Sequence, residues 1–276
     1  MPTVLVTGTS SGIGLAAATR FHAAGWRVLA TVRKPADAAM LRTTLPGCTV
    51  LEVDLTDSAA VARVAGAAIT AAGGVDVLVN NAGASIIGAA EELSLADFRA
   101  QLDLNLLAAI QLSQLVLPGM RARGAGRIVQ VSSGFGRIAL PMFSAYCAAK
   151  YALEGYSEAL AHEVAPFGIA VSLVEPGPVA TRFDGNRREG AHYDTKGPYA
   201  GLYARMRARL AASHAGRASS AEDVAAVIHR AATMPRPALR YPVGGMGLAA
   251  ALAARFVPDA LKLLAVRRMT GPGGSP

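Results

Sequence analysis

Short apolar runs rich in β-branched residues alternate along this chain with longer, alanine-rich stretches. The runs occupy residues 4–7, 28–32, 49–53, 75–79, 127–131 and 169–174. They are apolar throughout rather than at every second position, which is typical of strands covered on both faces. Helix-forming stretches lie between them, at residues 13–24, 58–71, 96–120 and 145–164. This alternation predicts an α/β fold of the Rossmann type, a doubly wound parallel β-sheet with helices on both faces.

The pattern continues through most of the 276 residues without a repeat or a low-complexity linker, so we expect a single domain. Residues 1–240 are expected to form its Rossmann-type part, including an insertion at about residues 182–217. Residues 241–276 are expected to be a C-terminal tail extension of the same domain.

Composition and targeting signals favour a cytoplasmic protein. Hydrophobic residues make up 52% of the chain, enough for a large core without disulfides. Cys48 and Cys147 lie far apart and, like the five histidines, match no metal-ligand spacing, so we expect free thiols and no metal. A strand-like run begins at Val4, which argues against a secretory signal. The late apolar stretch 248–254 is too short to cross a bilayer, so no transmembrane segment is expected.

The net charge of +8 is concentrated late in the chain. Residues 1–181 hold 12 basic and 13 acidic side chains, whereas residues 182–217 hold eight against three and residues 241–276 hold four against one. No nucleic-acid-reading motif accompanies these basic residues, so a nucleic-acid partner is not expected. An anionic ligand, a membrane surface and a merely solvated basic face all remain open.

A glycine-rich turn follows the first expected strand directly. Gly8, Gly12 and Gly14 are spaced G-x-x-x-G-x-G and lead into a helix. Glycines let a backbone approach a pyrophosphate, and a helix N-terminus offers amide donors to it. Taken alone, the turn is equally compatible with a tight strand-to-helix connection.

Two further motifs carry chemistry. Residues 80–83, Asn-Asn-Ala-Gly, follow the fourth expected strand, at the sheet edge where ligands of such folds bind. Tyr146 and Lys150 are four residues apart on an expected helix, so both side chains share one face. A cation beside a phenol lowers its pKa from about 10 toward the range useful for proton transfer. The Y-x-x-x-K spacing alone is common by chance.

In combination, the motifs are specific. The glycine-rich turn, N-N-A-G, a serine thirteen residues before Y-x-x-x-K, and Pro176-Gly177 followed by Thr181 occur in this order. Over roughly residues 3–235 the chain resembles the classical short-chain dehydrogenase/reductase family. Residues 146–155 and 175–179 are similar to its 17β-hydroxysteroid and retinol dehydrogenase-like branch.

The resemblance implies a catalytic tetrad of Asn105, Ser133, Tyr146 and Lys150. Tyr146 would exchange a proton with the substrate oxygen, while Lys150 would lower the Tyr146 pKa and hold the nicotinamide ribose hydroxyls. Ser133 would stabilise charge on the substrate oxygen, with Ser132 as the competing candidate. Asn105 would anchor a water that relays protons to Lys150; the alternative is a buried structural asparagine.

The resemblance also implies a nicotinamide cofactor, bound by residues 8 and 10–14, residues 33, 54 and 55, residues 81–83, and residues around the Pro-Gly loop. These are Gly8, Ser10, Ser11, Gly12, Ile13, Gly14, Arg33, Asp54, Leu55, Asn81, Ala82, Gly83, Tyr146, Lys150, Pro176, Gly177, Val179 and Thr181. Enzymes of this fold that use NAD place an acidic residue at the end of the second strand. Here Val32 takes that position and Arg33 follows, which favours NADP(H) over NAD(H). The alternative is that Arg33 and Lys34 are simply the solvent-exposed end of a strand.

The predicted function is therefore an NADPH-dependent oxidoreductase that interconverts a lipophilic ketone or aldehyde and its alcohol. The resemblance implies that residues 182–217 form a lid over the substrate, with an apolar inner face from Phe183, Tyr193, Tyr199, Tyr203 and Met206. The alternative is a non-catalytic NADPH-binding regulatory protein on the same fold. Related enzymes pair two long helices between subunits, which implies a homodimer or homotetramer.

Overall fold

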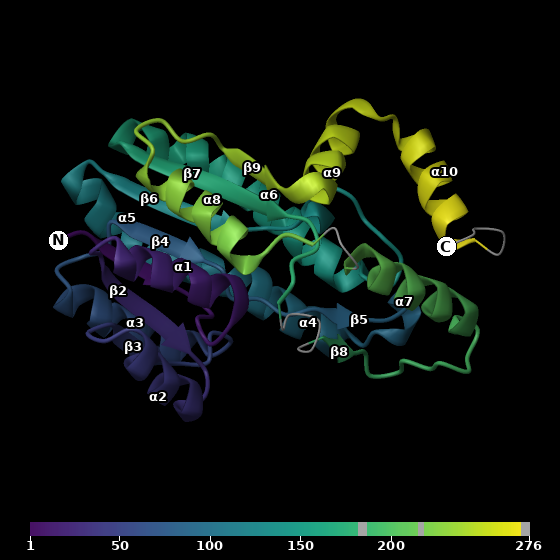
Figure 1. Cartoon of the computed structure of the whole chain (residues 1–276), viewed down its shortest axis with the longest axis horizontal. Helices are drawn as coiled ribbons and strands as arrows, with labels where there is room; N and C mark the ends of the chain where they lie inside the picture. The colour runs from purple at the N-terminus through teal and green to yellow at the C-terminus, as the bar shows by residue number, and fades with distance from the viewer. Residues whose placement is uncertain (182–186, 215–217, 272–276) are drawn as a thin grey trace.

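Seven parallel strands form the centre of the computed structural model, which describes residues 1–181, 187–214 and 218–271 (Figure 1). Their order across the sheet is β3-β2-β1-β4-β6-β7-β9. The strands are β1 (Thr3–Val6), β2 (Arg27–Val32), β3 (Thr49–Glu52), β4 (Val77–Asn80), β6 (Gly126–Val131), β7 (Ile169–Pro176) and β9 (Arg240–Val243). The predicted doubly wound sheet is confirmed, and the six predicted strands agree with it to within two residues at each end.

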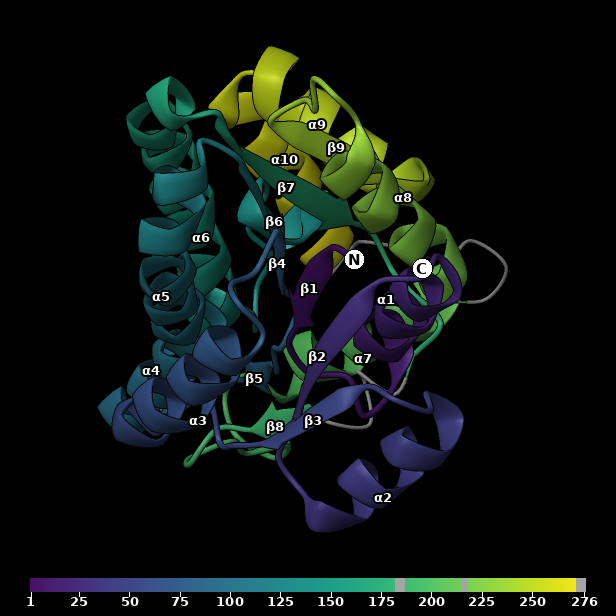
Figure 2. The same cartoon turned by 90° about the vertical axis from the view of Figure 1, so that its left-hand side faces the viewer.

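Helices cover both faces of the sheet in a single domain (Figure 2). On one face lie α1 (Gly12–Ala23), α2 (Pro35–Thr44) and α8 (Ala221–Thr233), and on the other α3 (Ser58–Ala71), α5 (Ala108–Arg123) and α6 (Ser144–Val164). Val4 and Val6 of β1 pack in the first of these cores, and Leu5 packs in the second. Because successive side chains of a strand point to opposite faces, an unbroken apolar run fills both cores at once.

Asn105 lies where one expected helix is interrupted. The stretch predicted at 96–120 is instead α4 (Leu95–Leu102), a π-helical turn η2 (Asp103–Leu107) and α5. Within the described residues, Leu95–Arg123 is the one helical stretch long and apolar enough to cross a membrane. Buried core helices meet the same criteria, and Leu112 and Val116 of this stretch are buried against the sheet.

Shorter elements shape the rim of the sheet. They are a two-stranded pair of β5 (Ile86–Ile87) and β8 (Arg188–Glu189), and single turns η1 (Ala90–Glu92), η3 (Gly134–Gly136) and η4 (Ala165–Phe167). Ser94 and Asp97 form a capping box that starts α4. Such reciprocal hydrogen bonds satisfy the first amides of a helix.

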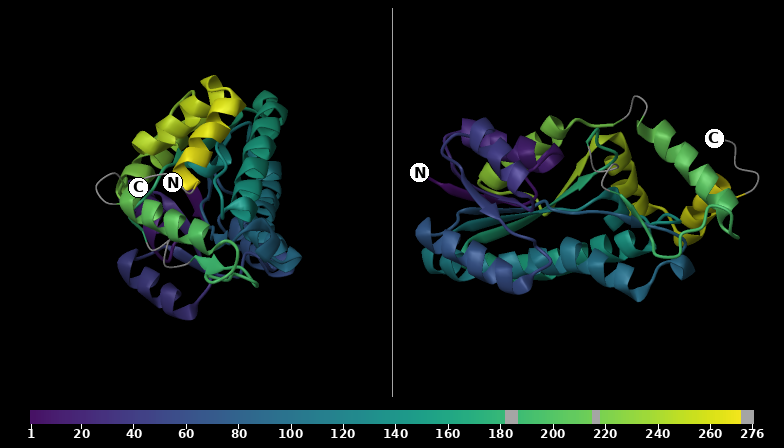
Figure 3. Two further views of the ribbon diagram at one scale, coloured as in Figure 1. Left: turned by 90° about the vertical axis from the view of Figure 1, so that its right-hand side faces the viewer. Right: turned by 90° about the horizontal axis from the view of Figure 1, so that it is seen from below.

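The end of the chain is more ordered than a simple tail. β9 extends the sheet beside β7, and the sequence did not predict it. It leads into α9 (Gly244–Phe256) and α10 (Asp259–Thr270), a helical hairpin that stands next to α7 (Ala200–His214) (Figure 3). The region expected as a tail therefore begins as a strand of the central sheet.

Candidate active site

The glycine-rich turn packs against the segment that follows β4. Gly8 and Gly12 have positive φ angles of 69° and 57°, which only glycine adopts without strain. A Cβ at Gly14 would lie 2.2 Å from Gly8 O, and one at Gly8 would lie 2.8 Å from Ala82 Cα. Asn81 Nδ2 donates to Thr7 O at 2.9 Å. Because glycines have no side chain at these close approaches, the N-terminus of α1 stays accessible from the cavity.

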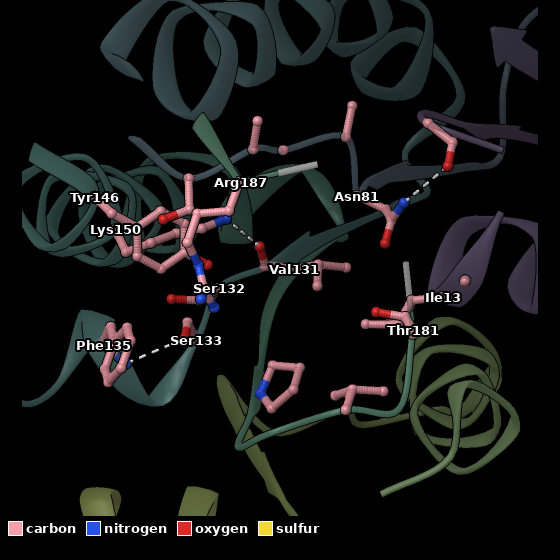
Figure 4. Close-up of a pocket in the computed structure, with 18 of the residues that line it drawn as sticks. Ile13, Asn81, Val131, Ser132, Ser133, Phe135, Tyr146, Lys150, Thr181 and Arg187 are labelled. Atoms are coloured by element: carbon pink, nitrogen blue, oxygen red, sulfur yellow. Dashed lines mark hydrogen bonds between the residues drawn. The ribbon is translucent and has the colours of Figure 1, made fainter. Parts of the chain in front are cut away.

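A cavity of about 1300 Å³ runs along the carboxyl ends of the strands, from the glycine-rich turn to α9 (Figure 4). Ile13, Asn81 and Thr181 lie on one side of the view, and Ser133, Tyr146 and Lys150 on the other. Of the cofactor-binding residues predicted from the sequence, all except Gly14 line it.

The segments that follow β2 and β3 form another wall of the cavity. Val32 is buried, and the exposed Arg33 and Lys34 follow it into the lining. A backbone hydrogen bond from Thr56 lowers the pKa of Asp54, and the charge of Arg33 lowers it further. Asp37, in the first turn of α2, lines the cavity as well and was not predicted.

Tyr146 and Lys150 share one face of α6, as their spacing predicted. Both are almost fully buried, and Lys150 Nζ lies 5.7 Å from the centroid of the Tyr146 ring. Lys150 Nζ donates to Val131 O at 2.8 Å. Burial lowers the Lys150 pKa to about 8, and the charge of Glu154 partly opposes this.

Burial raises the pKa of Tyr146 above its usual value, while a side-chain hydrogen bond with Ser133 works in the opposite direction. Lys150 Nζ donates to a backbone carbonyl here and is not among the main causes of this shift, so a lowering of the Tyr146 pKa by Lys150 stays a prediction. The phenol therefore stays protonated at neutral pH.

The two candidate serines differ in environment. Ser133 lies two residues after the end of β6. It caps η3 by accepting from Phe135 N at 3.1 Å, and it hydrogen-bonds Tyr146. Ser132 Oγ is buried and has no hydrogen-bond partner among the described residues. Ser133 is thus the serine that the structure brings to the phenol.

Asn105 lies in the π-helical turn, behind the cavity rather than in its lining. Its Nδ2 donates to Ala84 O at 3.0 Å and to Gln101 O at 3.1 Å. Its buried Oδ1 has no hydrogen-bond partner among the described residues and lies 2.7 Å from where a Cβ on Gly83 would be. π-Helical turns often mark functional sites, and this one leaves an acceptor ready for a water.

Behind Lys150, a buried pair of carboxylates faces two arginines. Glu154 on α6 and Glu175 at the end of β7 are 5% and 0% exposed. Arg240 Nε lies 3.0 Å from Glu154 and 3.5 Å from Glu175, and Arg137 lies 3.7 Å from each. Burial raises the pKa of Glu175 to about 7, Glu154 adds to this, and the two arginines oppose it.

The Pro-Gly loop joins this network to the other end of the cavity. Gly177 N donates to Val243 O at 3.0 Å, and Thr181 lies against Gly12, where a Cβ would be 3.2 Å from its side chain. A Cβ on Gly247 of α9 would lie 2.7 Å from Glu175 O. β9 and α9 thus hold the loop in place.

The remaining lining is largely apolar. Phe135, Ile138, Leu140, Phe143, Met206 and Leu210 contribute to it, with Met246, Ala249, Ala250 and Ala253 of α9. Arg187, Arg188 and Arg209 add positive charge to the lining, and Arg187 Cζ lies 5.7 Å from the Phe143 centroid. Such a surface suits a lipophilic molecule that has a few polar groups.

The lid prediction is partly wrong. Tyr193, Tyr199 and Tyr203 do not line the cavity, whereas Met206 does. Tyr203 accepts from Ala89 N at 2.8 Å and donates to Glu92, and Tyr193 stacks on its ring. The Tyr203 hydroxyl thus joins α7 to the segment around η1. Phe183 lies outside the described residues.

The arrangement fits a nicotinamide dinucleotide. A Cβ would fill the space at Gly8, Gly12 and Gly14, so only glycine keeps the helix N-terminus approachable by a pyrophosphate. The cavity then continues past Asn81 to Tyr146 and Lys150. Within the described ranges, His, Cys, Asp and Glu side chains form no group of three that could hold a metal.

Comparison with known proteins decides the family. The family model described as short chain dehydrogenase matches residues 2–192. The chain is a short-chain dehydrogenase. Among curated relatives, the "Uncharacterized oxidoreductase YbbO" of Escherichia coli (strain K12) is 36% identical over 92% of this chain and 90% of its own.

This short-chain dehydrogenase is also similar to the retinol and hydroxysteroid dehydrogenase-like branch. Retinol dehydrogenase 8 of Bos taurus is 37% identical over 86% of this chain and 80% of its own length. Estradiol 17-beta-dehydrogenase 1 of Rattus norvegicus is 37% identical over 86% of this chain and 72% of its own.

Solved structures agree with the fold. A short-chain dehydrogenase from Streptomyces avermitilis superposes with a TM-score of 0.83 at 34% identity, covering 96% of this chain and 95% of its own. A metagenomic short-chain oxidoreductase in complex with NADP has a TM-score of 0.70 at 28% identity, covering 88% and 96%. The chain therefore belongs to this oxidoreductase family and has its fold, and members of the family bind a nicotinamide cofactor.

Sequence reasoning missed parts of the site that lie far apart in the chain. Glu154 follows Lys150 by four residues on one helix face, a spacing that could have revealed it. Arg240 and the small residues of α9 have no local signal, because only the fold brings them to the cavity.

Proposed function

We propose that this short-chain dehydrogenase is an NADPH-dependent carbonyl reductase and alcohol dehydrogenase acting on a lipophilic ketone or aldehyde. The observation that carries the proposal is the position of Tyr146. It lies in one cavity between the glycine-rich turn on one side and an apolar wall on the other. The bound cofactor supplies the hydride.

Each tetrad residue has a separate role in this proposal. Tyr146 donates its phenol proton to the substrate oxygen in reduction and takes it back in oxidation. Ser133 hydrogen-bonds the same oxygen as negative charge develops on it. Lys150 holds the nicotinamide ribose hydroxyls, and Asn105 offers its unpaired Oδ1 to a water that passes protons toward Lys150.

The protonation states are compatible with Tyr146 as the proton donor in reduction. The raised pKa of Tyr146 keeps the proton that reduction consumes, and a Lys150 pKa of about 8 leaves this side chain cationic at neutral pH. The opposite assignment, a non-catalytic NADPH-binding regulator, gives no reason for Ser133 to hydrogen-bond a buried phenol. The intact tetrad therefore favours an enzyme.

NADP(H) is proposed over NAD(H) because no carboxylate stands at the end of β2. Val32 is buried there, and Arg33 and Lys34 line the cavity. A guanidinium pairs well with a 2′-phosphate, and Ser10 adds a hydroxyl to the same region. The metagenomic relative with NADP bound is in line with this preference.

We further propose that the enzyme is cytoplasmic and assembles as a homodimer or homotetramer. Cys48 and Cys147 are free thiols in the structure, in keeping with a reducing compartment. The outer faces of α5 and α6 would form the contact between subunits.

Oxidation of NADPH against a panel of ketones and aldehydes tests the reaction. We expect turnover with lipophilic members of the panel and a kcat/KM with NADPH well above that with NADH. No turnover of any carbonyl, with NADPH still bound, would favour the regulatory alternative.

The cofactor preference has its own test. Charge-assisted hydrogen bonds contribute roughly 1.5–3 kcal/mol, so Arg33→Ala should weaken the preference for NADPH about ten- to hundred-fold. Adding Val32→Asp should weaken it further, since a carboxylate repels a phosphate and accepts a diol. Unchanged selectivity in the double variant would move 2′-phosphate recognition to Ser10 and Lys34.

A further inference from the structure

Large apolar side chains gather on the outside of the C-terminal hairpin. We call this set the hairpin surface; its members are 43–69% exposed and are Leu248, Leu252 and Phe256 of α9 and Leu261, Leu263 and Leu264 of α10. Figures 1 and 3 show the hairpin at the edge of the molecule, beside α7. Exposed apolar patches of this kind mark interaction sites.

α9 presents different residues on its two sides. Leu248, Leu252 and Phe256 recur every fourth residue and form one stripe along the helix. On the inner side, Gly247 is buried against the Pro-Gly loop, and Ala250 and Ala253 line the cavity. Small residues thus let α9 approach the site, while its large residues are directed to the outside.

α10 has almost no core of its own. None of its residues with a described side chain is buried, and Arg205 Nε of α7 holds its end by donating to Thr270 O at 2.7 Å. A helix of 12 residues is marginal in water unless an apolar face is covered. The exposed leucines therefore indicate that another surface, outside this chain, covers the hairpin surface.

The charge around the hairpin surface is strongly positive. Residues 244–271 contain Arg255, Lys262, Arg267 and Arg268 against the single acidic residue Asp259. Asp259 is paired with Lys262 at 2.7 Å, so three exposed arginines remain beside the leucines. A second copy of the chain would bring the same sign of charge to this surface, whereas an anionic surface complements it.

We propose that the hairpin surface docks on a lipid bilayer that contains anionic headgroups. The leucines and Phe256 enter the boundary between headgroups and acyl chains, and Arg255, Arg267 and Arg268 contact lipid phosphates. Basic and apolar side chains in one short helical unit are the signature of helices that lie in a membrane interface. Docking does not depend on the proposed reaction. Only a further step, the delivery of a lipophilic substrate from the membrane to the cavity beside α9, rests on the proposed function.

Vesicle co-sedimentation of the full-length protein tests the docking. We expect at least about tenfold tighter binding to vesicles of phosphatidylcholine with phosphatidylglycerol than to phosphatidylcholine alone, and weaker binding at high salt. Leu252→Ser and Phe256→Ser should each weaken binding to the mixed vesicles about tenfold. Arg267→Gln with Arg268→Gln should reduce the preference for the mixed vesicles.

Leu95→Ser is the matched control, because Leu95 is 72% exposed on α4, away from the hairpin surface. It should bind vesicles as the unaltered protein does, and circular dichroism should show all variants folded. Absence of binding to the mixed vesicles, or an equal loss in Leu95→Ser, would overturn the proposal. So would a smaller molecular mass of Phe256→Ser without lipid, which would assign the surface to a second copy. Turnover of a water-soluble aldehyde, measured in parallel, reports on the proposed function separately.

Discussion

At the scale of single residues, Tyr146 and Lys150 show how burial sets protonation. Desolvation disfavours the charged form of any group, so it raises the pKa of the phenol and lowers that of the ammonium. Both shifts leave each group protonated at neutral pH. Ser133 hydrogen-bonds the phenol, and both residues line the cavity.

Tyr146→Phe tests this assignment with the least disturbance to packing. The change removes the transferable proton and keeps the ring, so the fold and the affinity for NADPH should persist. Proton transfer by a positioned group contributes roughly 10²–10⁴-fold, and kcat should fall by about that factor. Cofactor fluorescence and steady-state rates measure the two effects. Rates within a few-fold of the unaltered enzyme would show that another group handles the proton.

The residues of this centre were predictable from the sequence to different degrees. Tyr146 and Lys150 were predicted from their spacing on one helix, and Ser133 from the resemblance, through its spacing to Tyr146. Burial, which is the largest cause of both pKa shifts, was not predictable, because it depends on the whole fold rather than on spacing. The prediction that the lid tyrosines line the cavity was wrong, because contacts between distant segments decide where such side chains lie. The Tyr203 hydroxyl, for example, hydrogen-bonds to Ala89 and Glu92, which are distant in sequence.

At the scale of elements, β9 connects the end of the chain to the site. It begins at Arg240, whose guanidinium reaches Glu154 on α6, Glu158 one turn later and Glu175 on β7. Removal of one partner from a buried ion cluster leaves charge uncompensated, which costs far more than loss of an exposed pair. Arg240 therefore strengthens the attachment of this edge strand, which also pairs with β7 through the backbone.

Arg240→Met should lower the free energy of unfolding by roughly 2–4 kcal/mol, measured by urea denaturation. The cost should depend on pH. The pKa of Glu175 is raised in the folded state to about 7, so the folded protein holds this proton more tightly than the unfolded chain does. The stability from this group is complete below the unfolded pKa and is lost as pH rises toward 7.

Arg240 opposes that loss while Glu175 is ionised, so the variant should lose more stability at about pH 8 than at about pH 5. Arg42→Met is the control, because Arg42 and Glu52 form a solvent-exposed pair at 3.1 Å and should contribute no more than about 1 kcal/mol. Equal losses in the two variants at both pH values would contradict a structural role for the buried cluster.

Elements were predictable where local pattern and burial coincide. Continuous apolar runs gave six strands, because both faces of those strands are covered. β9 was missed because it is a short edge strand, in which Pro242 is tolerated but obscures the pattern. The π-helical turn within the helix expected at 96–120 was not predicted, because Asn105 meets its acceptors, the carbonyl oxygens of Ala84 and Gln101, only in the folded chain.

At the scale of the whole molecule, the outer faces of α5 and α6 remain uncovered in a single chain. Leu107 is 50% exposed where α5 begins. On α6, Ala148, Ala152, Gly155 and Ala159 are exposed and follow one side of the helix. Small side chains on one side let a second helix approach closely. This face suits the pairing of subunits that the family resemblance implies.

Gly155→Arg tests that assembly without disturbing the single chain. A Cβ on Gly155 would meet no atom within 4 Å, so a large side chain fits the monomer but would collide with a subunit packed on α6. Gly66→Arg on α3 is the matched control, because a Cβ there also meets open space. Both changes replace a helical glycine and should keep or raise stability by up to about 1 kcal/mol. Light scattering should give a dimer or tetramer mass for the unaltered protein and for Gly66→Arg, and a smaller mass for Gly155→Arg. A monomer mass for the unaltered protein at micromolar concentration, or an unchanged mass for Gly155→Arg, would contradict an interface on α6.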